Sequence, residues 1–413
     1  MKKTCLFLTG LFVSVFGLFA QKADTAHYRS RKLTLSEVNL VSSYYNQDGN
    51  NSAVTGGTGT EALSDYSNQF EVKLHSFNRH GREVSWEASL GVDYYTSASS
   101  DKINPYSISS ASARDLRIYP SVTRRVLADS SGMSWFAGVS YSHESDYRSY
   151  GLHGGFGRRS SDRNTEWSFK AQFFFDQVKM ILPIELRTPA TGGFPGAPNE
   201  YEYPWSKRNT LAGTFSWSRI LNSRLQVMAT SELTYQHGFL GLPFHRIYFK
   251  DFSLGTEKLP SVRIKWPIAV RASWFAGDRL IIRPSYRFYL DDWGLAAHTA
   301  ELEAVIKTGK FLSISPFYRF YSQSGIRYFA GYLEHQHTEK YYSSNFDLSG
   351  FNSHFFGGGL RYTPWKGCWA LGTCLPWNSV TAIIFEQWIV CRYCQSIPHY
   401  KVHEKRASGP FFM

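Results

Sequence analysis

The sequence predicts an all-β fold, an antiparallel transmembrane β-barrel, from three observations. The first is strict alternation: in Glu83–Thr96, the residues Val84, Trp86, Ala88, Leu90, Val92 and Tyr94 alternate with Ser85, Glu87, Ser89, Gly91 and Asp93. Side chains of a strand point to opposite faces in turn, so this segment has one apolar and one polar face. The second is length, which exceeds the about 5–6 residues of a typical globular strand and reaches the about 9–11 residues that cross a bilayer. The third is a regular alternation of short and long connections.

Residues 1–20 have the features of a secretory signal peptide. Lys2 and Lys3 are basic, residues 6–19 form an apolar run, and the small Ala20 precedes Gln21 as a cleavage point. The apolar run is shorter than the about 20 residues that a transmembrane helix needs. The sequence therefore predicts export, with a barrel domain over residues 21–364.

Composition supports a barrel and argues against nucleic acid as a partner. Aromatic residues reach 17%, with 26 Tyr, 31 Phe and 12 Trp, which suits the girdles at the two membrane interfaces. The mean hydropathy of −0.32 is low for a membrane protein. Barrel strands hide half of their residues from lipid, however, so a low value is expected. The net charge of +12 is spread within the strands, whereas nucleic-acid binders gather basic residues in a patch or stripe.

About fourteen strands are expected before Pro364. They cover residues 33–45, 69–77, 83–96, 117–127, 134–143, 147–157, 165–175, 209–221, 225–235, 263–275, 279–290, 294–307, 311–321 and 354–363. Each has period-two alternation, and several pairs flank tight turns rich in Gly, Asn and Asp, the residues that turns favour. Examples are the turns at 129–132, 222–224, 276–278 and 308–310.

The connections sort by parity. Short turns follow the even-numbered strands, whereas the long links (46–68, 97–116, 176–208, 236–262 and 322–353) follow only odd-numbered ones. Bacterial barrels have short periplasmic turns and longer outer loops, so this order predicts a periplasmic N-terminus in the bacterial outer membrane. A secreted β-sandwich also has alternating strands, but nothing in that fold sorts its loops by parity.

Several blocks resemble a family of uncharacterised outer-membrane barrel proteins, a domain of unknown function common in Bacteroidetes and other Gram-negative bacteria. They are GGTGTEALSDYSN (56–68), ISSASARDLRIYPS (108–121), YQHGFLGLPFHRIYF (235–249), EKLPSVRIKWPIAVRASWF (257–275), DDWGLAAHTAELE (291–303), ISPFYRFY (314–321) and FNSHFFGGGLRYTP (351–364). The resemblance covers most of the mature chain and implies location and architecture rather than an activity. Some relatives accompany periplasmic flavin-transfer and electron-transport proteins.

The tail, residues 365–413, differs from the rest. The resemblance implies two more strands, about sixteen in all, an even number as in single-chain bacterial barrels. Instead the alternation stops, and Cys368, Cys374, Cys391 and Cys394 appear. A zinc site fits poorly, because Cys368 and Cys374 are too far apart for the usual ligand spacing. A disulfide in an oxidising compartment is a second interpretation. We favour a third, a shifted reading frame that begins near Trp365.

The polar faces carry the candidate functional residues. The candidates for the lumen lining are Glu87, Asp93, Glu166, Lys170, Arg263, Lys265, Arg271, Arg283, Arg287, Glu301, Glu303 and Arg319. Acidic members come mainly from earlier strands and basic ones from residues 263–287. They form either an ion-pair lattice that fills the lumen or a charged constriction that selects small anions or polar solutes.

Two loops carry weaker candidates. The link after residue 235 contains His237, Phe244, His245 and Arg246, and it folds either into the lumen as a plug or over the outside as a cap. His335 and His337 lie two apart and are weak candidates for a metal site, because exposed His pairs are common without metal. No motif marks a nucleophile with its base, so we expect no catalytic residue, no cofactor and no enzyme.

The sequence therefore predicts an outer-membrane channel or uptake component for small polar solutes. A non-conducting scaffold for periplasmic or surface partners, including redox proteins, is the alternative, and a barrel enzyme is the second alternative. The expected partners are outer-membrane lipids, the barrel-assembly machinery and periplasmic proteins, with no nucleic acid.

Overall fold

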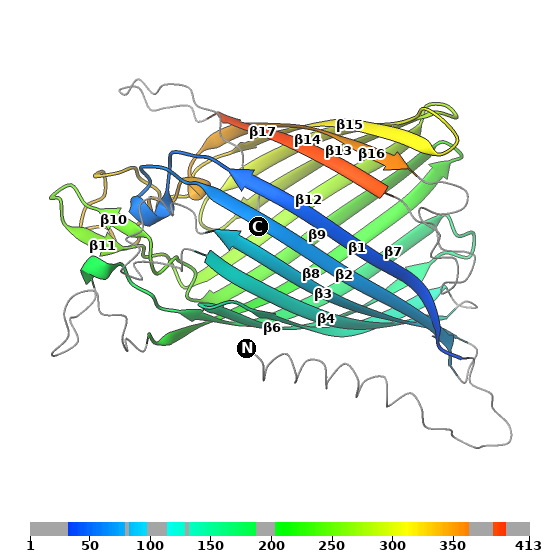
Figure 1. Ribbon diagram of the computed structural model, residues 1–413, viewed down its shortest axis with the longest axis horizontal. Helices are drawn as coiled ribbons and strands as arrows, with labels where there is room; N and C mark the ends of the chain where they lie inside the picture. The colour runs from blue at the N-terminus through cyan, green and yellow to red at the C-terminus, as the bar shows by residue number, and fades with distance from the viewer. Residues whose placement is uncertain are drawn as a thin grey trace, which may run out of the picture.

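The computed structural model describes residues 32–78, 82–96, 114–128, 132–186, 203–362 and 383–393. It is dominated by one 15-stranded antiparallel sheet that curves into a barrel (Figure 1). The predicted signal peptide and most of the predicted tail, including Cys368, Cys374 and Cys394, lie outside the described residues. Within the described ranges, no helix is long and apolar enough to cross a membrane.

The strands follow one another in the sheet in chain order. They are β1 (Thr34–Gln47), β2 (Leu63–Phe77), β3 (Glu83–Thr96), β4 (Arg114–Ala128), β5 (Met133–His143), β6 (Tyr147–Arg159), β7 (Thr165–Lys179), β8 (Trp205–Asn222), β9 (Leu225–Gly238), β12 (Val262–Phe275), β13 (Leu280–Asp291), β14 (Ala296–Lys307), β15 (Leu312–Gln323), β16 (Phe351–Tyr362) and β17 (Ile383–Tyr393). The hairpin of β10 (Arg246–Tyr248) and β11 (Leu254–Thr256) forms a separate two-stranded sheet. All sheet strands except β17 precede residue 363, which confirms the predicted number of about fourteen.

Most strands extend a few residues beyond the predicted ends. β2 begins at Leu63 instead of residue 69, and β8 begins at Trp205 instead of residue 209. In both places the extra residues pair with a neighbour, Leu63 with Gln47 and Trp205 with Lys179. The backbone hydrogen bonds of a ladder do not depend on side-chain polarity, so the strands continue after the alternation fades.

β17 is not predicted by the period-two pattern, yet the structure pairs it with β16. The ladder runs from Tyr362 opposite Ile383 to Asn352 opposite Tyr393. The segment IIFEQWIVCRY is rich in β-branched and aromatic residues, which favour strands. β1 and β17 are the edges of the sheet, and in the described part of the chain no ladder joins them, so the barrel is not closed.

Short and long connections lie at opposite ends of the barrel. Since every neighbouring pair is antiparallel, the turns between β2 and β3 and between β8 and β9 lie at one end, and the loops after β1, β9 and β15 lie at the other (Figure 1). We call these the turn end and the loop end. The turns are held locally: the backbone N–H of Arg224 donates to Asn222 Oδ1 at 2.8 Å, and that of Arg82 donates to Asn78 Oδ1 at 3.0 Å. This arrangement confirms the predicted sorting of connections.

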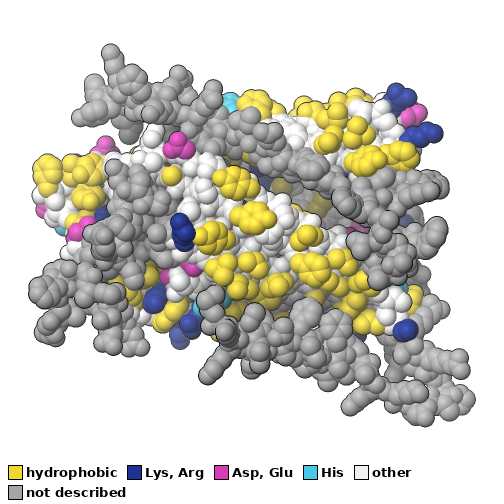
Figure 2. Space-filling model, viewed as in Figure 1, with side chains coloured by type: hydrophobic (Ala, Val, Ile, Leu, Met, Phe, Trp, Pro, Cys, Tyr) yellow, Lys and Arg dark blue, Asp and Glu magenta, His cyan; other side chains and the backbone are white. Residues whose placement is uncertain are grey.

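The outer face of the barrel is apolar and exposed. Figure 2 shows hydrophobic side chains spread over the strands of the visible face. Around the whole sheet, the large hydrophobic residues that remain exposed include Leu90, Val139, Phe173, Leu211 and Leu302. The compact hydrophobic core is instead small and lies at the loop end, where Tyr289, Trp293, Leu295, Ala297 and Ile326 pack together. A water-soluble sandwich would bury the apolar faces of its strands in a core, whereas this sheet exposes them.

Candidate functional site

The inner wall formed by β12, β13, β14 and β15 carries a ladder of arginines and glutamates. In register, Glu301 lies opposite Ser285 on one side and Arg319 on the other, and Glu303 lies opposite Arg283. Arg319 Nε donates to Glu301 Oε2 at 2.6 Å. Glu303 Oε2 is shared more loosely by Arg271 at 3.5 Å and Arg283 at 3.4 Å. The structure thus brings together five of the predicted residues, from four neighbouring strands.

A cavity of about 570 Å³ opens on this wall. Arg271, Arg287, Glu301 and Arg319 line it, together with aromatic side chains and several hydroxyls. Arg287 lies between two small neighbours, Ala269 on β12 and Thr299 on β14. Its side chain is exposed, and among the described residues no ion pair or hydrogen bond of Arg287 is present.

A second cavity, of about 480 Å³, is lined by residues of β2 to β9. Its lining includes Arg117, Tyr119, Tyr147 and Asp176. Arg208 Nε donates to Asp176 Oδ2 at 2.9 Å, and Arg208 Nη2 donates to the Tyr147 hydroxyl at 3.0 Å. These groups are already paired with one another, as in a lattice that braces a lumen.

The acidic candidates from earlier strands lie apart from the arginine ladder. Asp93 on β3 accepts hydrogen bonds from the hydroxyls of Ser67 at 2.5 Å and Tyr119 at 2.9 Å. Glu87 lies opposite Lys73 on β2. Glu166 forms an ion pair with Arg159 at 3.0 Å. Lys170, on β7, lies opposite Gly155 and Thr214. Asp93, Glu87 and Glu166 thus each have a polar or basic neighbour of their own, on strands away from the arginine ladder.

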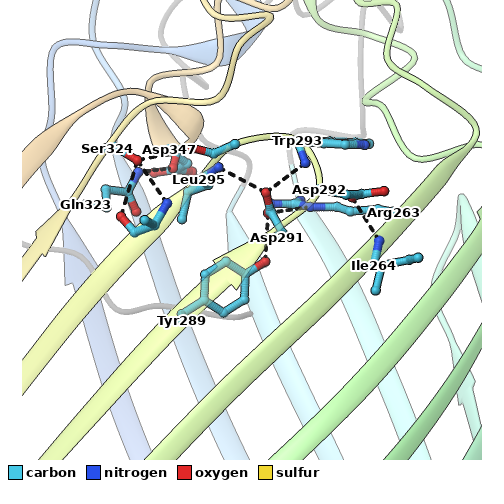
Figure 3. A network of polar contacts seen from close by, with 12 residues as sticks. Arg263, Ile264, Tyr289, Asp291, Asp292, Trp293, Leu295, Gln323, Ser324 and Asp347 are labelled. Carbon is cyan, nitrogen blue, oxygen red and sulfur yellow. Dashed lines mark hydrogen bonds and ion pairs between the residues drawn. The ribbon is translucent and has the colours of Figure 1, made fainter.

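Arg263 belongs to a buried network at the loop end, shown in Figure 3. Its Nε and Nη2 donate to Asp291 Oδ2 at 2.9 and 2.5 Å. The hydroxyl of Tyr289 donates to the same oxygen at 2.9 Å, and the backbone N–H groups of Trp293 and Leu295 donate to Asp291 Oδ1 at 3.0 Å each. The guanidinium of Arg263 also stacks over the Trp293 ring at 4.3 Å. Lys265 is paired with Asp291 in the ladder between β12 and β13.

This network is structural rather than open to a solute. The Asp291 side chain has no exposed surface, and its two oxygens accept five hydrogen bonds. A buried carboxylate is tolerated when it is paired and fully hydrogen-bonded in this way. Sequence reasoning missed Asp291, although the run Asp-Asp-Trp-Gly, which ends at Gly294 with a φ of +96°, has the residues of a tight turn.

The loop after β9 lies beyond the ends of the strands and forms part of a cap, not a plug in the lumen (Figure 1). We use "cap" for residues 48–62, 239–261 and 324–350. Backbone bridges join Phe249 to His335 and Lys258 to Tyr342, so the two longer loops are tied together. Arg246 Nη1 donates to the carbonyl of Val54 at 2.9 Å, and this hydrogen bond connects residues 48–62 to the loop after β9. The geometry thus selects the cap interpretation of the two that the sequence left open.

The four residues predicted in this loop have different positions. His237 is exposed at the end of β9, opposite Val262, and Phe244 is half-buried. Arg246 pairs with Glu185 at 3.0 Å. His245 is completely buried, with its Nδ1 3.5 Å from Glu257 Oε1. Glu257 in turn accepts from the Ser343 hydroxyl at 2.5 Å and from the backbone N–H of Leu242 at 2.6 Å.

His335 and His337 contact different partners. His335 is buried, with Nδ1 2.6 Å from Glu339 Oε2 and Nε2 donating to the Ser343 carbonyl at 3.0 Å. His337 is exposed, 3.3 Å from Asp251 Oδ2, and its ring stacks on Phe249. Both nitrogens of His335 already face acceptors, so binding a metal there would cost a hydrogen bond. The metal site stays a prediction from sequence, and the geometry gives it no further support.

One acidic cluster was not predicted. Carboxylate oxygens of Asp115, Glu144 and Asp146 lie within 4.8 Å of one another at the loop end. Burial, followed by the charges of Asp115 and Glu144, raises the pKa of Asp146 to about 6. Burial also raises the pKa of Glu144. No local motif joins these residues, because Asp115 comes from β4 and the other two from the connection between β5 and β6.

Comparison with known proteins gives a family and distant structural similarities. No curated protein matches the chain. A mutant of the ferric enterobactin receptor PfeA from Pseudomonas aeruginosa is 10% identical with a TM-score of 0.42, over 80% of this chain and 51% of the receptor. The siderophore receptor PirA from Acinetobacter baumannii is 10% identical with a TM-score of 0.44, over 81% of this chain and 52% of that one. A FadL homologue from Pseudomonas aeruginosa is 12% identical with a TM-score of 0.30, over 71% of this chain and 81% of that one.

The chain spans about half the length of the two receptors. Residues 123–364 match the family described as "Protein of unknown function (DUF3570)". That match includes the arginine ladder, the Asp291 network and two of the three cap loops. Because it covers more than half of the sequence, the chain belongs to the DUF3570 family.

Proposed function

We propose that this protein is an outer-membrane β-barrel that lets small polar solutes cross the membrane through its lumen. The observation that carries the proposal is the contrast between the two faces of one sheet. The outer face exposes Leu, Phe, Trp and Val side chains, whereas the inner face carries paired charges and two cavities of about 570 and 480 Å³. An apolar outer band with a polar interior is the arrangement of channel-forming barrels.

The two kinds of connection support an orientation in the membrane. Short turns of bacterial barrels face the periplasm and longer loops face outside. We therefore propose that the turn end, where β1 begins, faces the periplasm and that the cap faces the exterior. The arginine ladder then lies on the path of a solute that has passed the cap.

Conductance of the refolded full chain in planar bilayers tests this proposal. We expect stepwise single-channel currents in potassium chloride from protein that migrates differently with and without boiling, the usual sign of a folded barrel. Folded protein that gives no current would overturn the channel and favour the alternative, a non-conducting scaffold. Protein that stays in aqueous extracts without detergent would overturn the membrane location itself.

A further inference from the structure

The arginine ladder has more positive charge than its own carboxylates neutralise. Arg271, Arg283, Arg287 and Arg319 extend from β12, β13 and β15 around only two acidic residues, Glu301 and Glu303 of β14. Glu301 is engaged by Arg319, and Glu303 is divided between Arg271 and Arg283 at 3.5 and 3.4 Å. Arg287 has no acidic partner among the described residues, so the wall has two surplus positive charges.

Carboxylates on neighbouring strands are occupied elsewhere. On β9, Glu232 accepts from the hydroxyls of Thr214 at 2.9 Å and Thr234 at 3.0 Å. Asp291, on the same strand as Arg287, is saturated by Arg263, Tyr289 and two backbone N–H groups. In the described structure, no carboxylate lies within ion-pair distance of Arg287.

The cavity beside Arg287 has the lining of a site for a small ligand. Arg271, Arg287 and Arg319 reach it from β12, β13 and β15, and the hydroxyls of Thr230, Thr299 and Ser353 line it as further donors. Its volume of about 570 Å³ lies within the range of small-molecule pockets. Only one carboxylate, Glu301, lines it, and that one is 2.6 Å from Arg319.

We propose that Arg271, Arg287 and Arg319 form a binding site for small oxyanions, with Arg287 as its central residue. The planar guanidinium binds carboxylate or phosphate oxygens through two parallel N–H donors, which a lysine cannot do. A bound oxyanion neutralises the surplus charge and accepts from the nearby hydroxyls. The proposal rests on the proposed function, in that the solute reaches the site through the lumen, and it names the class of solute.

Binding to the full-length folded protein in detergent at low salt tests the site without requiring conductance. The probes are succinate for a carboxylate and inorganic phosphate for a phosphate, each followed by isothermal titration calorimetry. We expect Arg287→Gln to weaken binding of the preferred probe about tenfold, as befits the loss of one charge-assisted bidentate contact. Arg287→Lys keeps the positive charge but loses the two parallel N–H donors of the guanidinium, so we expect it to weaken binding less than Arg287→Gln does.

Lys170→Gln is the matched control, because it removes one positive charge from the inner wall of β7, away from the ladder. It should bind as tightly as the wild type. If neither probe binds, or if Arg287→Gln and Lys170→Gln weaken binding equally, the site is overturned. Which probe binds decides between carboxylate and phosphate solutes.

Currents then separate this inference from the channel itself. In a conducting wild type, the preferred probe should reduce the current at millimolar concentration, and Arg287→Gln should need about ten times more of it. Conduction that the probe leaves unchanged in both proteins would overturn the oxyanion site and leave the channel standing. Binding in the absence of conduction would overturn the channel and leave the site standing.

Discussion

Asp291 and Arg287 lie on the same strand, and their surroundings give them opposite roles. Asp291 has no exposed side-chain surface and accepts five hydrogen bonds, so it fixes the loop between β13 and β14. Arg287 lies on the same strand, closer to its middle. Its side chain is exposed to a cavity and has no acidic partner among the described residues. A charged group that its own chain satisfies stabilises the fold, whereas one left open is available to a ligand.

Asp146 is the residue for which we predict a pH dependence. It lies in the connection between β5 and β6, and burial raises the pKa of its carboxyl from 3.8 to about 6. A raised pKa means that ionisation is harder in the folded state, so the folded state loses stability as the pH rises through about 6. We expect Asp146→Asn to raise the free energy of unfolding at pH 7.5 by about 1–3 kcal/mol, and to have no effect at pH 4. Thermal unfolding at the two pH values measures this.

Asp162 supplies a control with the opposite sign. It is exposed in the turn between β6 and β7, where a hydrogen bond from the Ser160 hydroxyl, followed by those from Asn164, lowers the pKa of its carboxyl. Its stabilising effect is present at neutral pH and is lost as the pH falls, so Asp162→Asn should lower the melting temperature at pH 7.5. Equal effects of Asp146→Asn at both pH values would contradict the assignment of the raised pKa to Asp146.

At the scale of elements, the cap is a folded unit made of three loops that are far apart in the sequence. The first loop contains η1 (Ala53–Thr55) and contacts β10, while the loop after β15 contains η4 (Phe346–Leu348). Two glycines of the first loop allow it to approach the other two loops closely. A Cβ at Gly56 would lie 2.7 Å from the Tyr248 ring, and one at Gly57 would lie 2.7 Å from the Ser344 carbonyl oxygen. Both have positive φ, which glycine adopts without strain.

We therefore predict that Gly57→Ala loosens the first loop from the rest of the cap. The left-handed backbone of residue 57 alone should cost about 1–2 kcal/mol, and the contact with a backbone oxygen adds to it. Hydrogen exchange in a peptide that covers residues 48–62 should become faster, since the Gly57 N–H donates to Ser52 O at 2.8 Å within this loop and a loosened loop opens that bond to water more often. Gly309→Ala is the control, because nothing lies within 4 Å of a Cβ at that position. Exchange unchanged in Gly57→Ala would show that docking does not need this glycine.

For the whole molecule, the outer face must meet lipid if the proposed location is right. Leu302 is near the middle of β14, on the outer face, and 51% exposed. We predict that Leu302→Arg destabilises the barrel by about 2–4 kcal/mol, the cost of an arginine at the bilayer midplane. Gln172→Arg places the same side chain on the inner wall of β7, where water is available, and should be tolerated. The temperature at which the folded band disappears on gels measures both variants in vesicles, and equal temperatures would argue against a lipid-facing surface.

The barrel, its strand order and the sorting of its connections could be predicted from sequence, because each depends on local patterns. Alternation at period two can be recognised within one strand, as in β3. The short turns can be recognised from their Gly, Asn and Asp residues. The list of inward-facing charges also follows from this alternation, since a residue's face depends only on its position in the strand.

The tertiary structure decided which of those charges meet. Glu301 faces Arg319, and Glu303 faces Arg283, only because of the register between β13, β14 and β15, and a shift by one residue would turn each side chain to the other face. The pairing of β17 with β16, the five hydrogen bonds of Asp291 and the docking of the cap loops likewise join residues that are distant in sequence. The physical reason is that strand periodicity is a short-range property, whereas register, burial and charge pairing are set by contacts between strands and loops.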